Sequence, residues 1–140
     1  MNAPVPRAQI ERLVPHAGAM CLWHEVVAWD AQSIDCRTQG HRDPAHPLRR
    51  NGRLAAVHLA EYGAQAMAIH GGLLAGAAEP RLLTALRDVE LLVERIDDLE
   101  GELHGHAQPL LAMAGGSIYQ FEIFCGGRRL AQGRVTAQSA

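Results

Sequence analysis

The stretch LAAVHLAEYGAQAMAIHGGLLAG, residues Leu54 to Gly76, decides how the rest of the chain is arranged. It contains no proline and is apolar nearly all the way round, which is typical of a helix buried on most of its surface. Many of its residues are alanine or glycine, and such small side chains let other backbone approach closely. The stretch therefore predicts a central helix around which a sheet wraps.

One stripe of this helix is polar. His58, Glu61 and Gln65 are spaced so that they lie on one helical face. Burying an ionisable carboxylate is costly unless the group is paired, protonated or directed into a pocket. Glu61 is therefore the strongest candidate for a functional residue in the chain.

The composition is that of an ordinary globular protein. Of the 140 residues, 48% are hydrophobic and 20% are charged, which favours one domain spanning residues 1–140. The net charge of −2 provides no general attraction for nucleic acid or for an anionic membrane. All 13 basic residues are arginine, which excludes a P-loop lysine and a lysine Schiff base.

Cysteine usage and hydropathy indicate the compartment. The three cysteines form no C-x-x-C pair, so we expect reduced, mostly structural thiols. The first residues lack the continuous apolar run of a secretory signal. The one long apolar stretch contains Glu61, which argues against a membrane span. We therefore expect a cytoplasmic protein.

The pattern along the chain predicts one further helix and six strands. The short helix is expected at Arg7–Leu13, and Asn51 is expected to cap the N-terminus of the central helix. An antiparallel meander interrupted by one long helix follows, and this layout predicts an α+β fold. The strands are expected at residues 21–29, 33–38, 81–96, 102–113, 117–125 and 128–137.

Two motifs resemble a known family. The loop HRDPAHPLRRNGRL spans residues 41–54, directly after Gln39-Gly40, and the helix segment EYGAQAMAIH spans residues 61–70. With Val14-Pro15-His16 ahead of the first strand, they resemble the hotdog-fold β-hydroxyacyl-acyl-carrier-protein dehydratases. The match is closest to the subgroup linked to aryl-polyene and related pigment biosynthesis. In the hotdog fold, an antiparallel sheet wraps around one long central helix.

The resemblance implies a lyase that removes water from a (3R)-hydroxyacyl thioester in fatty-acid or polyene-type biosynthesis. It assigns His41 as the base for the α-proton, Glu61 as the acid for the departing hydroxyl, and the Ala56 amide as a donor to the thioester carbonyl. Histidine suits the first task because its pKa lies near neutrality, and apolar surroundings raise the pKa of a carboxyl group.

The resemblance also implies partners rather than a cofactor. The acyl group is carried on the phosphopantetheine of an acyl carrier protein, and no cofactor is expected. The family takes its histidine and its glutamate from different subunits, so we expect a homodimer or a heterodimer with another hotdog subunit.

The chain departs from the better-known dehydratases at two places. Leu54-Ala55-Ala56 stands where those enzymes have Phe-Pro-Gly, and Pro47 stands at their usual histidine spacing. His41 fills the role of base only with an insertion of about six residues in the loop. His46, and His58 one turn from Glu61, are therefore alternative bases.

Other polar residues are candidates for substrate binding. Gln65 is expected to bond the helix to its surroundings or to orient Glu61. The arginines of the loop form a positive patch that suits an acidic carrier protein and its phosphate. His104 and His106 share one strand face without a third ligand, so we expect no metal site. The candidate binding residues are Ala56, His46, His58, Gln65, Arg49, Arg50 and Arg53, with Arg42 in the same patch.

Two other functions stay open on the sequence. In a hotdog thioesterase, Glu61 would activate water and the loop histidine would not be needed. A non-catalytic hotdog subunit would instead complete the active site of a partner, which the missing Phe-Pro-Gly and the displaced histidine keep possible.

Overall fold

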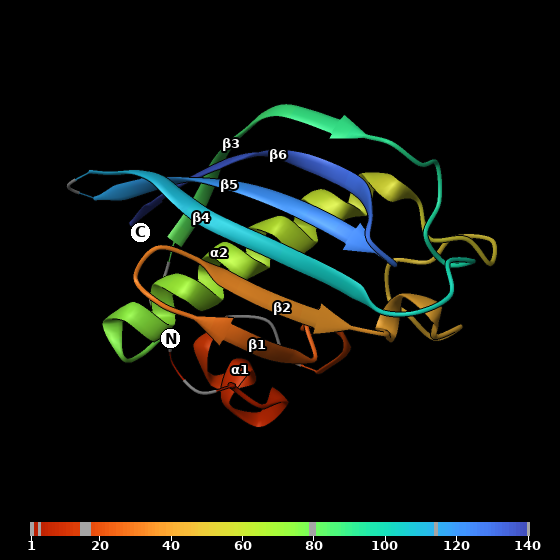
Figure 1. Ribbon diagram of the computed structural model, residues 1–140, viewed down its shortest axis with the longest axis horizontal. Helices are drawn as coiled ribbons and strands as arrows, with labels where there is room; N and C mark the ends of the chain where they lie inside the picture. Colours follow the sequence, from red (N-terminus) through yellow and green to blue (C-terminus); the bar gives the residue numbers. More distant parts are fainter. Residues whose placement is uncertain (1, 3, 15–17, 79–80, 114, 140) are drawn as a thin grey trace.

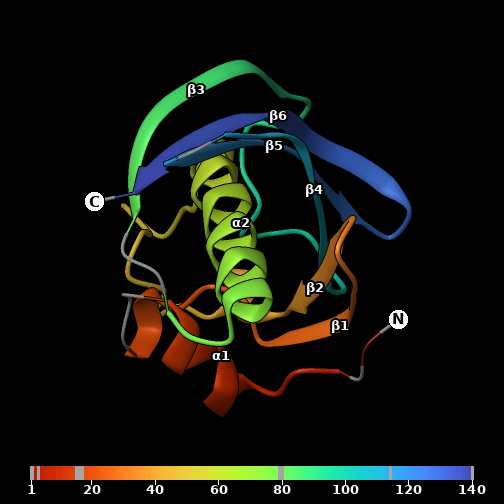
Figure 2. The ribbon, with the colours of Figure 1, turned by 90° about the vertical axis from the view of Figure 1, so that its left-hand side faces the viewer.

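A six-stranded antiparallel sheet curves around one long helix in the computed structural model, which describes residues 2, 4–14, 18–78, 81–113 and 115–139 (Figure 1). The helix, α2, lies against the concave face of the sheet (Figure 2). Three short 3₁₀ turns at Gly18–Met20, Gly40–Arg42 and Ala56–His58 complete the elements. The helices and strands are α1 (Arg7–Leu13), β1 (Glu25–Trp29), β2 (Ile34–Thr38), α2 (Leu59–Ala75), β3 (Arg81–Leu91), β4 (Leu103–Met113), β5 (Gly116–Cys125) and β6 (Arg128–Ser139).

The order of the strands in the sheet is β1-β2-β4-β5-β6-β3. The α+β hotdog architecture is therefore confirmed, but the simple meander is not. β3 follows α2 in the chain and crosses to the far edge, where it pairs with β6. At the opposite edge, Asn2 and Val5 form bridges to β1. Within the described residues, no such bridge covers the outer edge of β3.

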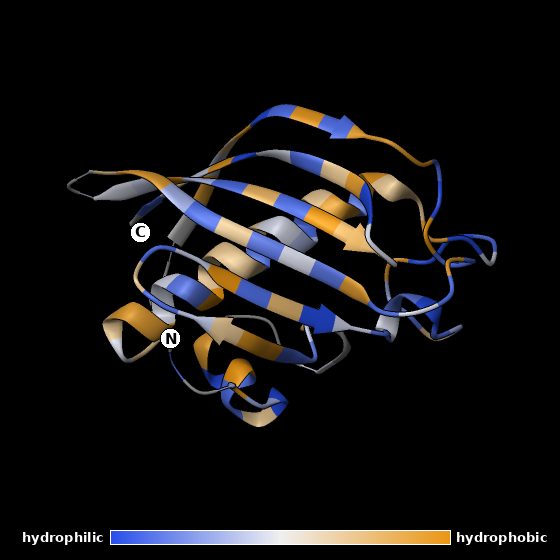
Figure 3. Ribbon diagram, viewed as in Figure 1, coloured by the Kyte–Doolittle hydropathy of each residue, from blue (hydrophilic) through white to orange (hydrophobic). Residues whose placement is uncertain are grey.

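Small residues bring α2 onto the sheet, as the sequence predicts. The burial of β5 alternates residue by residue, and its colouring by hydropathy is banded (Figure 3). Tyr119, Phe121 and Ile123 are on its buried face. A Cβ atom added at Gly63 of α2 would lie 2.5 Å from Cγ of Phe121. Only glycine fits at this crossing, since carbon atoms of real side chains do not approach that closely.

A buried polar pair fixes the C-terminal half of α2. Nε2 of His70 donates to the carbonyl of Asp30 at 2.6 Å, which leaves Nδ1 to accept from the hydroxyl of Tyr119 at 2.5 Å. His70 and Tyr119 are both buried. The pair connects the helix to the β1–β2 turn and to β5.

The boundaries of three predicted elements need correction. β1 begins at Glu25 rather than at residue 21, because the backbone of Met20 and Leu22 bonds to the Gln65 side chain of α2 and only His24 of this segment bonds to β2. The central helix begins at the Ala56–His58 turn, because Ala55 pairs with Arg95 in a bridge. Asn51 lies in a turn at φ 53° and caps no helix. β3 ends at Leu91 rather than at residue 96.

Candidate active site

His41 is held inside the protein by the loop that precedes α2. It lies in the 3₁₀ turn Gly40–Arg42, which begins where the Thr38 hydroxyl accepts the Gly40 amide at 3.0 Å. The imidazole is 0% exposed, and its Nε2 lies 2.9 Å from the carbonyl oxygen of Leu99. A carbonyl can only accept, so Nε2 carries the proton and Nδ1 presents a lone pair. Nδ1 is buried and has no partner among the described residues.

The surroundings of His41 favour its neutral form. Burial lowers the pKa of His41 because it penalises the charged imidazolium, and the hydrogen bond to Leu99 opposes this effect. The positive charges of Arg42 and Arg49 lower the pKa further. A neutral imidazole with a bare Nδ1 is the form that a general base requires.

His46, the alternative base in the same loop, has no free nitrogen. Its Nδ1 accepts the Leu48 amide at 3.1 Å, so Nε2 carries the proton and donates to the Tyr62 hydroxyl at 3.0 Å. Burial also lowers the pKa of His46. The geometry therefore favours His41 over His46 as the base.

Glu61 does not lie in the buried setting predicted for it. Its side chain is 51% exposed in the single chain, although its neighbours Ala60 and Tyr62 on α2 are buried. The nearest polar partner is Nδ1 of His58, at 3.2 Å from Glu61 Oε2. The two residues share a helical face as predicted, and His58 also lies close enough to the loop for its charge to act on His46.

The expectation for Ala56 also needs correction. Its amide donates to the carbonyl of Glu94 at 2.9 Å, so it is not available to a thioester. The next amide, that of Val57, has no acceptor among the described residues. Val57 is 59% exposed and stands at the N-terminal end of the helical segment, where amides point along the helix axis toward solvent or ligand.

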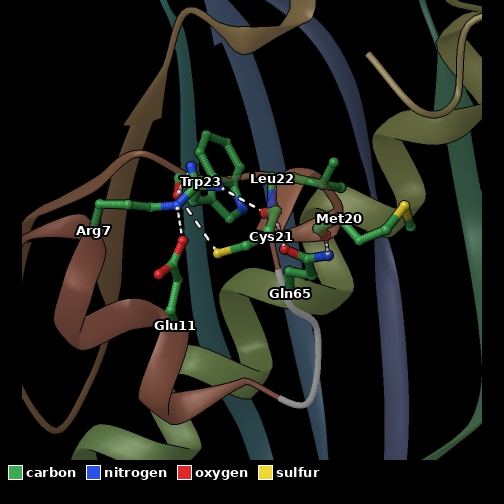
Figure 4. A network of polar contacts seen from close by, with 8 residues as sticks. Arg7, Glu11, Met20, Cys21, Leu22, Trp23 and Gln65 are labelled. Carbon is green, nitrogen blue, oxygen red and sulfur yellow. Dashed lines mark hydrogen bonds and ion pairs between the residues drawn. The ribbon is translucent and has the colours of Figure 1, made fainter. Parts of the chain in front are cut away.

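Gln65 fastens the segment before β1 to α2. Its Oε1 accepts the Leu22 amide at 2.8 Å, and its Nε2 donates to the carbonyl of Met20 at 2.7 Å (Figure 4). The Gln65 side chain is buried. Its amide is thus used for structure, and none of its hydrogen bonds reaches Glu61.

The arginines of the loop divide into two groups. Arg49 donates to the carbonyls of Gly52 at 3.1 Å and of His41 at 3.3 Å, so its side chain stabilises the conformation of the loop. Arg42, Arg50 and Arg53 are exposed and free to meet an anionic surface. The predicted patch therefore consists of these three residues.

A cavity of about 390 Å³ opens beside the loop. Its size is within the range of small-molecule sites. The wall combines apolar groups of Leu22 and Pro47 with polar groups of His24, Asp43 and His46. His41 does not line it, so the cavity and the bare Nδ1 are separate features of the single chain.

The sequence matches the model of one known protein family. The model of the ApeP-like family, described as ApeP dehydratase, matches residues 8–140. The chain belongs to this family. The resemblance seen in the loop and helix motifs is thereby confirmed, and with it the assignment to the hotdog dehydratases.

Solved structures show the same fold in a dehydratase heterocomplex and in other proteins. A chain of the dehydratase heterocomplex ApeI:P from Xenorhabdus doucetiae superposes with a TM-score of 0.84 at 23% identity, over 97% of this chain and 91% of that one. The E. coli PaaI protein of the phenylacetic acid degradation operon gives 0.60 at 16% identity, over 81% and 80%. Zebrafish thioesterase superfamily member 2 gives 0.64 at 14%, over 96% and 95%. No curated protein sequence matches the chain significantly.

Two contributors to this ApeP-like site were missed in the sequence. Leu99 orients His41 through a carbonyl, and no side-chain pattern reveals a backbone acceptor 58 residues away. Tyr62 accepts a hydrogen bond from His46, but the sequence pattern places it on an apolar helix and assigns its hydroxyl no partner. A buried tyrosine needs a partner for its hydroxyl, and that need was the available signal.

The described residues contain no group of three potential metal ligands. His106 instead pairs with Asp35 at 2.8 Å, while His104 is exposed on the same strand. In the described part of the chain, no helix has the length and hydropathy needed to cross a membrane.

Proposed function

We propose that this chain is a catalytic subunit of a (3R)-hydroxyacyl-[acyl-carrier-protein] dehydratase, a lyase that needs no cofactor. The observation that carries the proposal is His41, an uncharged imidazole whose Nε2–H is fixed on Leu99 and whose Nδ1 is bare. Cytoplasmic location is part of the proposal, because the three cysteines are free and buried rather than paired.

The proposed reaction uses three groups. Nδ1 of His41 removes the α-proton, and the electrons of the broken C–H bond form the α,β double bond. The β C–O bond breaks, and the hydroxyl leaves as water with the proton of Glu61. The Val57 amide, in place of Ala56, donates to the thioester oxygen as negative charge develops there.

A second hotdog subunit completes this arrangement in the proposal. Glu61 is exposed in the single chain, whereas His41 is buried, so the single chain does not bring the two groups together in one pocket. Covering Glu61 with a partner would enclose it together with the bound acyl group, away from water. The solved ApeI:P heterocomplex supports a heterodimer, and a homodimer is the alternative.

The exposed arginines suit the acyl carrier protein. Arg42, Arg50 and Arg53 lie on the loop that holds His41. Acyl carrier proteins are acidic, and arginine binds both carboxylates and the phosphate of phosphopantetheine well. Docking at these residues would deliver the acyl thioester next to His41 and the N-terminal end of α2.

A non-catalytic subunit is the second candidate, and the complete burial of the His41 ring favours it. The thioesterase alternative has weaker support, since PaaI and the zebrafish thioesterase resemble the chain in fold alone. In both alternatives His41 would have no role in turnover.

Turnover of a β-hydroxyacyl carrier protein separates these functions. The chain is incubated with it alone and together with a second hotdog subunit, and the product is identified by mass spectrometry. An enoyl product that disappears with His41→Gln supports the dehydratase. Release of free acid indicates a thioesterase. An enoyl product that needs the partner and is unaffected by His41→Gln identifies a non-catalytic subunit.

A further inference from the structure

The loop of residues 39–53 holds the proposed base but is not part of the sheet. Its own hydrogen bonds are local turns, such as those from His46 to Asp43 and from Arg49 to His46. Within the described residues, the bond between His46 and Tyr62 is the one hydrogen bond that joins this loop directly to α2. This bond is therefore the direct polar link between the loop and the helix, in addition to the His41–Leu99 bond, which holds the loop to the segment between β3 and β4.

The His46 end of this bond has a defined direction. Because the Leu48 amide occupies Nδ1, the imidazole must donate through Nε2. The ring also stacks on Tyr62, with centroids 6.3 Å apart and planes at 24°. A protonated ring would point an N–H at the Leu48 amide, so the geometry belongs to neutral His46.

The Tyr62 end is a rigid anchor. The residue is 0% exposed, and the ring of Trp23 packs edge-on against it at 5.4 Å and 84°. Nε1 of Trp23 also donates to the backbone carbonyl of Tyr62 at 2.8 Å. Tyr62 follows Glu61 directly, in the first turns of α2.

We infer that the His46–Tyr62 hydrogen bond is a positioning contact for dehydration, which fixes the loop of His41 against the N-terminal turns of α2. The inference rests on the proposed function. His41 and the Val57 amide must address the same acyl group, one from the loop and one from the helical segment. Their relative position decides the rate, since a displacement of about 1 Å costs up to about a hundredfold.

The buried pair His70–Tyr119 provides a matched control. It is also a histidine–tyrosine hydrogen bond on α2, with ring centroids 5.5 Å apart, but it lies at the other end of the helix. Tyr62→Phe and Tyr119→Phe each remove one hydroxyl oxygen and keep the ring. Only the first variant affects the loop if the contact is one of positioning.

The experiment measures turnover and amide exchange for both variants in the full chain, with the hotdog partner present if turnover requires it. Tyr62→Phe is expected to lower kcat about tenfold or more with KM changed less than about threefold. Amides of residues 40–49 are expected to exchange faster, while those of α2 stay protected. Tyr119→Phe is expected to lower thermal stability and to leave kcat and loop exchange unchanged.

Unchanged loop exchange and unchanged kcat in Tyr62→Phe would overturn the inference. So would an equal loss of kcat in both variants, because that pattern reports general destabilisation. If Tyr62→Phe does not fold, His46→Phe tests the same bond from the loop side, because it keeps an aromatic ring but has no donor for the Tyr62 hydroxyl, and the same results are expected. A wild-type complex that never forms enoyl product refutes the proposed function, whereas the exchange measurement still decides whether the bond holds the loop.

Discussion

His41 combines complete burial with an unused nitrogen, and the proposal that it is the base rests on that nitrogen. His41→Gln keeps a donor for the Leu99 carbonyl and removes the base. We expect this variant to fold normally and to lose dehydration activity by about a hundredfold or more. Steady-state kinetics on a β-hydroxyacyl carrier protein tests this, with the exposed His104→Gln as control. Full activity of His41→Gln would disprove the base assignment.

Three histidines have lowered pKa values in the folded protein, and this makes stability depend on pH. Burial is the main cause for His41, His46 and His70. The unfolded chain binds these protons more readily than the folded one, so acid favours unfolding. We expect the free energy of unfolding to fall as the pH drops below about 6.5. Urea unfolding at a series of pH values measures it, and constant stability down to about pH 5 would contradict it.

For individual residues, the sequence predicts neighbours along the helix but not exposure or long-range backbone bonds. Spacing along the helix was sufficient to predict that His58 and Glu61 lie together, and the catalytic roles of His41 and Glu61 stay predictions. The exposure of Glu61 could not be predicted from the apolar helix, since tertiary packing decides which helical faces the rest of the chain covers. The bond from Ala56 to Glu94 joins backbone groups distant in sequence, which no residue pattern encodes.

At the scale of elements, the contact between α2 and β5 depends on Gly63. Gly63→Ala improves helix propensity by about 1 kcal/mol, but its Cβ would lie within 2.5 Å of Phe121. We expect the clash to prevail and the variant to lose about 1–3 kcal/mol of stability. Thermal and urea unfolding measure the loss. The double variant Gly63→Ala/Phe121→Leu should recover part of it, and independent effects of the two changes would refute the close contact.

The strands were predictable where side chains alternate and less so where they do not. β5 alternates over its whole length and was found within one residue of its observed start. The segment before Glu25 is equally apolar, but Leu22 and Trp23 use their polar groups on α2. β3 pairs with β6 at the far edge of the sheet. The alternation of side chains within each strand does not reveal which strands pair, so this crossing could not be predicted.

At the scale of the whole molecule, the two edges of the sheet are unequal. The N-terminal segment bridges to β1 through Asn2 and Val5, whereas β3 presents an uncovered edge in the described residues. Three leucines of β3 are exposed: Leu83 at 53%, Leu86 at 46% and Leu91 at 40%. An open strand edge with exposed leucines is a site for pairing with another chain. The proposed second hotdog subunit would therefore join along β3.

Leu86→Arg tests this placement. A charge on the open edge should weaken subunit association about tenfold or more and reduce dehydration in parallel, because Glu61 of one subunit would no longer meet His41 of the other. Val27→Arg, on β1 and 40% exposed, should leave both unchanged, since that edge is already covered. Analytical ultracentrifugation and turnover at matched concentrations provide the two measurements. Weakened association in Val27→Arg with normal association in Leu86→Arg would place the interface at the β1 edge. Activity that persists in a monomer would refute the proposal that His41 and Glu61 of different subunits form one site.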